Sequence, residues 1–227
     1  MKKVLACLTI TALAVFCIFS LVNAESAKTN DGSGVVQKIP NYTPSSIEGK
    51  KQSVNSADGY ALGQSVPNFS LSAIDGKKVS LDSYKGKSVV VLDFWSAQCP
   101  VSKAYEDYMK KLTSDYASKG VVFLALAANK TESKDWITNV AKERNVNFPI
   151  LMDENHILAD KFDAQHTPEL FVLDKNGVVQ YHGAPDNQKQ SSDPSYKDHA
   201  RQALNELLAN KVVSVKETKA FGCSIKR

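Results

Sequence analysis

Two cysteines carry the chemistry that this sequence suggests, and the first is Cys99. It lies a few residues past a β-favouring run and precedes Pro100, a residue well suited to the first turn of a helix. A cysteine at a helix N-terminus meets free backbone N–H groups and a partial positive charge, which favour the thiolate. We therefore predict that Cys99 is a nucleophile that solvent can reach. The alternative is a buried structural cysteine, the common fate of a free thiol.

The second is Cys223, near the C-terminal end of the sequence. The chain has four cysteines, but Cys7 and Cys17 lie in an apolar N-terminal stretch. The other two are too few for a disulfide scaffold, in a chain long enough to build its own core. We expect them to serve chemistry rather than to staple the fold. The four histidines have no metal-ligand spacing, among themselves or with cysteine. No metal and no organic cofactor is expected, because the cysteine sulfur itself can carry out the reaction.

The N-terminal segment indicates export. Lys2 and Lys3 precede the apolar stretch Val4–Val22, and Ala24 is a small residue at the expected cut. This pattern is typical of a secretory signal peptide covering residues 1–24. An uncleaved membrane anchor is the alternative, because the apolar stretch could just span a bilayer. In both cases the rest of the chain works outside the cytoplasm, in the periplasm or secreted.

The composition limits the classes of protein to which this chain can belong. The 227 residues are 43% hydrophobic and 23% charged, which is typical of a globular protein. Residues 25–59 are rich in Ser, Asn, Lys and Gly and predict a flexible linker, followed by one domain over 60–227. Without residues 1–24 the net charge falls from +4 to +2, spread along the chain. So small and dispersed a positive charge does not predict a basic surface that would bind nucleic acid.

The elements that must position the cysteines alternate between strand and helix. Continuous apolar runs predict buried strands, and three- and four-residue spacings predict helices. We expect a hairpin within 66–81, strands over 89–94, 121–128, 170–174 and 178–181, and helices over 100–118, 132–144, 155–163 and 196–209. This order predicts an α/β three-layer sandwich whose mixed central sheet has helices on both faces. Cys99 then lies at the carboxyl end of a central strand, where sites in open α/β sheets fall.

Two motifs carry a family resemblance. The segment 91–102, with Cys-Pro-Val-Ser at 99–102, resembles the active-site segment of the thioredoxin superfamily, in which a strand ending Asp-Phe-Trp runs into a Cys-x-x-Cys helix. The second motif is Thr167-Pro168 before the strand at 169–174. The resemblance covers about residues 62–210 and implies a thioredoxin-like fold. It also implies that Pro168 is cis, packs beside Cys99 and, with Thr167, guides the substrate backbone.

One position departs from that family. The second cysteine of the motif is Ser102 here, and a hydroxyl cannot release a substrate held as a mixed disulfide. Ser102 could still hydrogen-bond to the Cys99 thiolate. The resolving thiol must then come from Cys223, from a small thiol such as glutathione or from another protein.

Three further residues follow from the resemblance. Asp93 stands where the family has a buried acid, and burial would raise its pKa into the range of a proton acceptor; the alternative is an outward-facing residue at a sheet edge. Trp95 would shield Cys99 and offer an apolar docking surface. His166 precedes the Thr-Pro motif, where a cationic imidazole would stabilise a thiolate; the alternative is a solvent-facing loop residue. His182 and Asp186 are expected to be ordinary loop residues.

A second resemblance concerns peroxide chemistry. Peroxiredoxins, a branch of the same superfamily, carry Thr or Ser three residues before the reactive cysteine, and Ser96 matches this position. They also carry a proline seven residues before it, where this chain has Leu92. They need an arginine as well; Arg144 and Arg201 are present, but the sequence places neither near Cys99.

The C-terminal segment is the most distinctive. It ends in Gly-Cys-Ser-Ile-Lys at 222–226 and is similar to that of bacterial redoxin-domain proteins classed with the alkyl hydroperoxide reductase/thiol-specific antioxidant proteins. We hypothesise that Cys223 attacks an oxidised Cys99, either a sulfenic acid or a mixed disulfide. The alternatives are a cysteine that only packs, or one that pairs with another molecule.

These features predict an extracytoplasmic thiol-disulfide oxidoreductase, an antioxidant redoxin with Cys99 as nucleophile. The alternatives are a peroxiredoxin-like peroxidase that uses the same cysteine and a non-enzymatic binding module that retains only the fold. The expected partners are protein or small-molecule thiols and disulfides, or hydroperoxides, together with a thiol reductant. No nucleic-acid partner is expected, and contact with a membrane only through an uncleaved signal segment.

Overall fold

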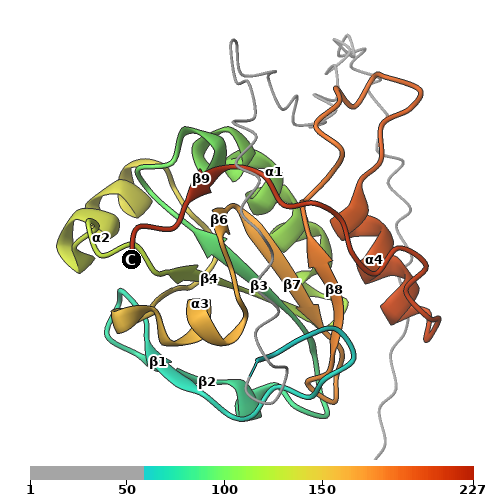
Figure 1. Ribbon diagram of the computed structural model, residues 1–227, viewed down its shortest axis with the longest axis horizontal. Helices are drawn as coiled ribbons and strands as arrows, with labels where there is room; N and C mark the ends of the chain where they lie inside the picture. Colours follow the sequence, from blue (N-terminus) through green and yellow to red (C-terminus); the bar gives the residue numbers. More distant parts are fainter. Residues whose placement is uncertain (1–58) are drawn as a thin grey trace, which may run out of the picture. The chain divides into compact units, whose positions relative to one another are not determined.

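A mixed sheet of five strands forms the centre of the fold (Figure 1). The computed structural model describes residues 59–227; the signal peptide expected over 1–24 and all but the last residue of the linker expected over 25–59 lie outside the described residues. The strands, in spatial order, are β5 (Ile150–Met152), β4 (Val121–Ala127), β3 (Val89–Trp95), β7 (Glu169–Leu173) and β8 (Val179–Gly183). β3, β4 and β5 run parallel, whereas β7 is antiparallel to both β3 and β8. The predicted mixed sheet with a parallel centre and an antiparallel edge hairpin is confirmed.

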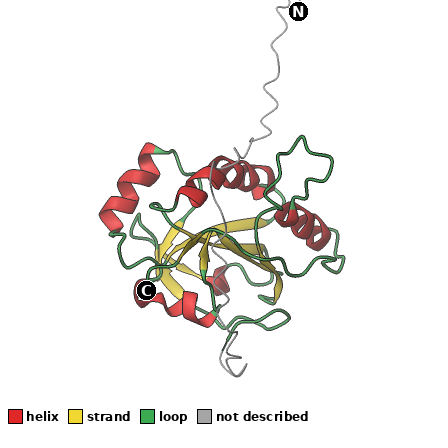
Figure 2. Ribbon diagram, turned by 45° about the horizontal axis from the view of Figure 1, so that its top comes forward, coloured by secondary structure: helices red, strands yellow, loops and turns green. Residues whose placement is uncertain are grey.

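Helices cover both faces of this sheet, as Figure 2 shows. One face packs against α1 (Pro100–Ala117), α2 (Lys134–Glu143) and α4 (His199–Leu208). The other packs against α3 (Ile157–Lys161) and the small hairpin of β1 (Ser70–Ser72) and β2 (Lys78–Ser80). The predicted three-layer α/β sandwich is therefore confirmed.

The central position of β3 follows from its composition. All seven of its residues are buried, as expected for a strand with neighbours on both sides and helices on both faces. Its side chains alternate between the layers: Val91 and Trp95 belong to the core cluster under α1, α2 and α4, whereas Leu92 and Phe94 belong to the cluster on the other face. α1 begins immediately after the loop that follows β3, with Cys99 as its N-cap.

Short strands account for most differences from the predicted elements. The strand expected from residue 66 is limited to β1, and the three-residue strand β5 was not predicted. Two further strands of two residues each, β6 (His166–Thr167) and β9 (Cys223–Ser224), were not predicted either. The helices end within a few residues of their predicted bounds. Within residues 59–227, no helix has the length and apolar character needed to cross a membrane.

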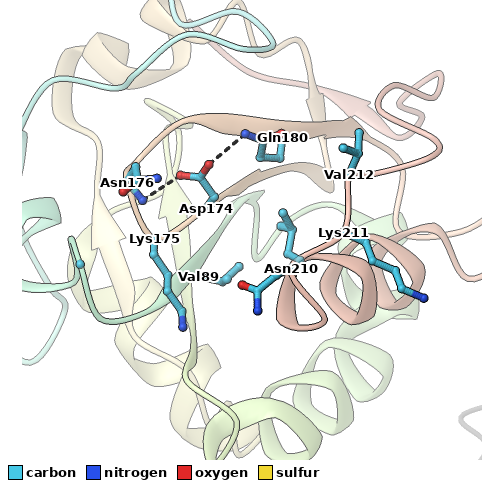
Figure 3. A pocket seen from close by; sticks show the side chains of 10 residues that line it. Val89, Asp174, Lys175, Asn176, Gln180, Asn210, Lys211 and Val212 are labelled. Carbon is cyan, nitrogen blue, oxygen red and sulfur yellow. Dashed lines mark hydrogen bonds between the residues drawn. The ribbon is translucent and has the colours of Figure 1, made fainter.

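A pocket opens at the end of the sheet opposite to Cys99 (Figure 3). It lies beside Val89, the first residue of β3, whereas Cys99 follows the last. One of its polar groups, the Asp174 carboxylate, accepts hydrogen bonds from the Asn176 backbone N–H at 2.8 Å and from Gln180 Nε2 at 2.9 Å. None of the residues that line this pocket belongs to the site described below.

Candidate active site

The Cys99 sulfur sits at the N-terminus of α1, as predicted. Its Sγ accepts a hydrogen bond from the Ser102 backbone N–H at 3.4 Å and donates one to the Thr167 carbonyl oxygen at 3.0 Å. The Cys99 backbone N–H donates to Ser96 Oγ at 3.1 Å. A thiolate at this position would receive the free N–H groups and the partial positive charge of the helix end. The local geometry therefore suits a nucleophilic sulfur.

The proline beside the sulfur adopts the expected isomer. The Thr167–Pro168 peptide bond is cis, and its Thr167 carbonyl is the acceptor for Cys99. β6 precedes this bond and β7 follows it, so the turn lies next to the carboxyl end of β3, the antiparallel neighbour of β7. Both motifs of the family resemblance thus meet at one sulfur atom.

The C-terminal segment also reaches this place. β9 pairs antiparallel with β6, with Cys223 opposite Thr167 and Ser224 opposite His166. In Figure 1 the segment crosses from α4 to β9 past the start of α1. Because the Thr167 carbonyl accepts the hydrogen bond of the Cys99 thiol, this register brings the two cysteines together, and both are free thiols. Two residues far apart in the sequence are therefore neighbours at the site.

Solvent access to the nucleophile differs from the prediction. Cys99 is only 2% exposed, and it belongs to a core cluster against which Phe221 and Cys223 of the C-terminal segment pack. The covering segment is the physical reason: its strand lies across the cis-proline turn that borders the sulfur. Trp95 is likewise 1% exposed, so the expectation that it offers a docking surface is wrong for this conformation.

Asp93 is buried in the middle of the sheet. β3 has a partner on each side, which excludes the alternative of an edge position. Strand alternation places Asp93 on the same face as Val91 and Trp95, which is the face of the cluster that contains Cys99. Burial raises the pKa of Asp93 to about 7. Neither carboxylate oxygen has a hydrogen-bond partner within the described chain, so nothing there offsets the burial.

Ser102 acts through a different atom from the one expected, and Ser96 acts through its hydroxyl. At Ser102 the backbone N–H, and not the hydroxyl, bonds to the Cys99 sulfur; its buried Oγ has no partner in residues 59–227. The Ser96 hydroxyl donates to Glu132 Oε1 and accepts from the Cys99 N–H and from Asn129 Nδ2 at 2.9 Å. Ser96 therefore positions the backbone of the nucleophile.

Glu132 holds the loop before Cys99, and the sequence analysis did not identify it. Its buried carboxylate accepts from the Ser96 hydroxyl, from the Ala97 N–H at 3.1 Å, from the Gln98 N–H at 3.2 Å and from Asn129 Nδ2 at 2.9 Å. One signal could have indicated it: this acid closely follows the carboxyl end of β4, a buried parallel strand beside β3.

Replacing Glu132 by alanine is expected to lower the free energy of unfolding by roughly 2–4 kcal/mol, because several buried donors lose their acceptor. Urea denaturation monitored by circular dichroism measures the change. Glu143→Ala, at an exposed acid of α2, is the control and should stay within about 0.5 kcal/mol of the parent. Equal effects of the two substitutions would show that the Glu132 contacts do not hold the loop.

A second buried carboxylate, Glu169, follows Pro168 directly. Its Oε2 accepts from the N–H groups of Gln165 and His166, both at 2.8 Å, and its Oε1 lies 2.6 Å from His182 Nε2. Burial alone would raise the pKa of Glu169, but the hydrogen bonds from His166 and His182 outweigh it and lower the pKa to about 2. Glu169 is therefore a carboxylate at every working pH.

The histidines near the site are bound to that carboxylate. The His166 ring nitrogen Nδ1 lies 3.8 Å from Glu169 Oε2, so a charge on this imidazole would be compensated by the acid beside it. His182 lies within β8 and stacks on Phe171, with ring centroids 4.3 Å apart. Asp186 is buried and accepts from the Tyr105 hydroxyl at 2.5 Å. The prediction that His182 lies in a loop is wrong, because it belongs to β8; Asp186 does lie in a loop, but it is buried there.

The two arginines considered for peroxide chemistry are engaged elsewhere. Arg144 donates from Nη2 to the Ala97 carbonyl at 3.2 Å and from Nη1 to Glu106 Oε2 at 3.3 Å. Arg201 pairs with Asp115 at 3.0 Å and with Asp198 at 3.2 Å. In the described part of the chain, neither guanidinium bonds to the Cys99 sulfur.

Comparisons with known proteins identify relatives of this chain. The chain is 33% identical over 177 residues to the thiol-disulfide oxidoreductase ResA of Bacillus cereus, covering 78% of this chain and 83% of the relative. It is 34% identical over 95 residues to ResA of Bacillus subtilis, covering 42% of this chain and 51% of that relative. These names agree with the prediction of a thiol-dependent oxidoreductase.

Solved structures support the same fold. An uncharacterized conserved protein from Geobacillus kaustophilus superimposes with a TM-score of 0.67 at 31% identity, covering 74% of this chain and 93% of that chain. A putative thiol:disulfide interchange protein DsbE from Chlorobium tepidum, at 21% identity and a TM-score of 0.52, shares the fold, over 67% of this chain and 98% of that chain. The model of the AhpC/TSA family matches residues 62–182, and the chain belongs to that family.

Proposed function

We propose that this protein is an extracytoplasmic thiol-disulfide oxidoreductase in which Cys99 is the nucleophile and Cys223 the resolving thiol. The observation that carries the proposal is the pairing of β9 with β6, which brings Cys223 against Cys99. The second cysteine of a Cys-x-x-Cys motif is absent, since Ser102 occupies its place. A thiol from the C-terminal segment supplies the missing group.

The electrostatics of the pair support this order of events. Burial, followed by the hydrogen bond and the charge of Cys99, raises the pKa of Cys223 to about 12. Cys223 therefore keeps its proton at neutral pH. When Cys99 enters a mixed disulfide, its charge and its hydrogen bond disappear, and part of the reason for the high pKa of Cys223 disappears with them. The resolving thiol becomes more nucleophilic when it is needed.

The reaction consists of two thiol-disulfide exchanges. The Cys99 thiolate attacks one sulfur of a substrate R–S–S–R′, forms Cys99–S–S–R and releases R′S⁻, which takes up a proton. Cys223 then loses its proton and attacks the Cys99 sulfur, which releases RS⁻ and leaves a Cys99–Cys223 disulfide. Two electrons pass from the protein to the substrate. A thiol reductant restores the two thiols, and the potential of the partner decides the direction of net flow.

Asp93 is the proton acceptor in this scheme. Burial raises the pKa of its carboxyl group to about 7, so it can exist in both protonation states near neutral pH. Its side chain faces the layer in which Cys99 lies, and no described partner holds its oxygens. Pro168 and Thr167 line the other side of the sulfur, where the Thr167 carbonyl fixes the thiol.

Disulfides are the substrates that this arrangement supports best. Peroxide chemistry would draw on Ser96 and an arginine, but the Ser96 hydroxyl bonds to Glu132 and to the Cys99 N–H. Arg144 is held by Glu106 and the Ala97 carbonyl. The extracytoplasmic location rests on the signal-like sequence over 1–24, and such compartments allow disulfide exchange.

Mapping the disulfide tests the proposal directly. Trypsin releases Cys99 in the peptide 88–103 and Cys223 in the peptide 220–226. After treatment with oxidised glutathione, mass spectrometry without reduction should find these two peptides linked. A sample reduced before digestion and a Cys223→Ser variant are the controls, and both should lack the linked species. If the parent protein never yields the linked pair, Cys223 is not the resolving thiol.

A further inference from the structure

The C-terminal segment is held as a strand between two loops of the active site. Besides the pairing of β9 with β6, the Ile225 N–H donates to the Gln165 carbonyl at 3.0 Å. On its other side the Lys226 N–H donates to Asn129 Oδ1 at 2.7 Å, and the Lys130 N–H donates to the Lys226 carbonyl at 2.9 Å. The main chain of the segment is therefore hydrogen-bonded along both of its edges, to residues 165–167 on one edge and to residues 129–130 on the other.

A glycine permits this close approach. Gly222 has a φ of +138°, and a Cβ at this position would lie 2.0 Å from the Thr167 carbonyl oxygen and 2.7 Å from its carbonyl carbon. The obstacle is backbone, which cannot move aside as a side chain can. The strand can lie across the cis-proline turn only because residue 222 has no side chain.

Few apolar contacts hold the segment. Ile225, 6% exposed, inserts into the core cluster on the α3 face, and Phe221 packs its ring on Tyr105 at 5.6 Å. Arg227 adds bonds of 2.8 Å to Asp160 Oδ1 and of 2.7 Å to the Ala164 carbonyl. A strand with one buried anchor and largely backbone hydrogen bonds belongs to the parts of a fold that open at low cost.

We propose that residues 222–227 form a displaceable strand that selects the substrates of Cys99 by size. This inference rests on the proposed thiol-disulfide exchange. Small disulfides react while the strand stays seated, because local movement around Cys223 is enough to admit them. A polypeptide disulfide also needs room for its own chain beside β6, where β9 already occupies the hydrogen-bonding groups. Polypeptides therefore react only after the whole strand has left.

The seated strand also shortens the life of the mixed disulfide. Cys223 already lies against Cys99, so release of a small thiol needs no large rearrangement. With a polypeptide substrate, the same displacement that admits the chain removes the resolving thiol from the site. The preference for small disulfides therefore applies to both exchange steps.

Alkylation of Cys99 tests whether the strand is the barrier. The full-length parent is Cys223→Ser, and the peptide 88–103 reports modification of Cys99 alone. Two reagents are compared: iodoacetamide, and a maleimide carried on a polymer of small-protein size. Gly222→Ala, made in this parent, should displace the strand and speed the reaction with the polymer reagent at least about tenfold, which corresponds to about 1.4 kcal/mol. The iodoacetamide rate should change less.

A matched control and a second variant make the result decisive. Gly63→Ala introduces the same methyl group at another positive φ, +79°, with no atom within 4 Å, and should leave both rates unchanged. Ile225→Asp removes the buried apolar side chain of the strand without a clash at Thr167, and it should speed the polymer-reagent reaction as Gly222→Ala does. It replaces Gly222→Ala in the test if the Gly222→Ala protein does not unfold cooperatively. Unchanged polymer-reagent rates in both strand variants would overturn the proposal.

Two disulfides then separate this proposal from the proposed function. In the Cys223→Ser parent, oxidised glutathione should form a mixed disulfide with Cys99 at least about tenfold faster, per disulfide bond, than native, disulfide-bonded insulin. Gly222→Ala should raise the rate with insulin and so lower the ratio of the glutathione rate to the insulin rate. Equal rates for the two disulfides in the parent would contradict selection by size. If neither disulfide reacts in any variant while alkylation follows the strand, the strand covers Cys99 but the thiol-disulfide chemistry fails.

Discussion

Cys99→Ser is expected to abolish thiol-disulfide exchange, with a loss of a thousandfold or more, on the order seen when a nucleophile is removed. The substitution exchanges only sulfur for oxygen. Serine is a favoured N-cap residue, so its Oγ can accept from the Ser102 N–H and α1 should begin at the same residue. The loss is therefore chemical and not a failure to fold. Reduction of oxidised glutathione with a thiol donor measures it.

Cys223→Ser is the informative contrast. This variant retains the nucleophile, so it should complete the first exchange and accumulate the mixed disulfide at Cys99, which intact-mass spectrometry detects. Cys99→Ser should form no such adduct. If turnover is the same in the parent and in Cys99→Ser, the protein is a binding module that has the fold without the reaction.

Asp93→Asn is expected to increase stability at alkaline pH while slowing exchange. Burial raises the pKa of Asp93 from 3.8 to about 7, so between these values the folded protein binds a proton that the unfolded chain has lost. Stability is therefore complete below about pH 4 and falls as the pH rises through 7. The difference corresponds to up to about 4 kcal/mol.

Urea denaturation at pH 5 and at pH 8 checks this sign. Asparagine stays neutral, so Asp93→Asn should exceed the parent by about 1.5 kcal/mol at pH 5 and by about 4 kcal/mol at pH 8. Asp107→Asn, at an exposed surface ion pair with Lys110, should stay within about 0.5 kcal/mol at both values. A variant that is less stable than the parent at pH 8 would mean that the Asp93 carboxylate is stabilised by contacts. Slower exchange in the more stable variant would assign Asp93 a role in the chemistry.

The sequence was sufficient where one local pattern decides the structure. A run of seven residues that is apolar except for Asp93 predicts a central strand, and Cys99-Pro100 shortly after it predicts a capped helix, so β3, α1 and the position of the sulfur could be predicted. The cis Thr167–Pro168 bond and the burial of Asp93 followed from the resemblance. In each case the signal lies within a few residues of its consequence.

Contacts between distant segments left no such signal. β6 and β9 have two residues each, too few for any periodicity, and they exist only because they pair with each other. The Glu132 carboxylate looked like one surface acid among 24 acidic residues until the fold brought it under the loop at Ser96. Trp95 and Cys99 were expected to be open to solvent because nothing local shows that the last residues of the sequence cover them.

The distance along the chain between the paired cysteines has a thermodynamic consequence. A bond between Cys99 and Cys223 would enclose 123 intervening residues, from α1 onward, whereas a bond within a Cys-x-x-Cys motif encloses two. In the chain-entropy picture so large a covalent loop lowers the entropy of the unfolded chain by the equivalent of about 4 to 5 kcal/mol. Oxidation would then act as a reversible clamp on the whole molecule, and each electron pair delivered by the reductant would loosen the entire fold along with the sulfur bridge.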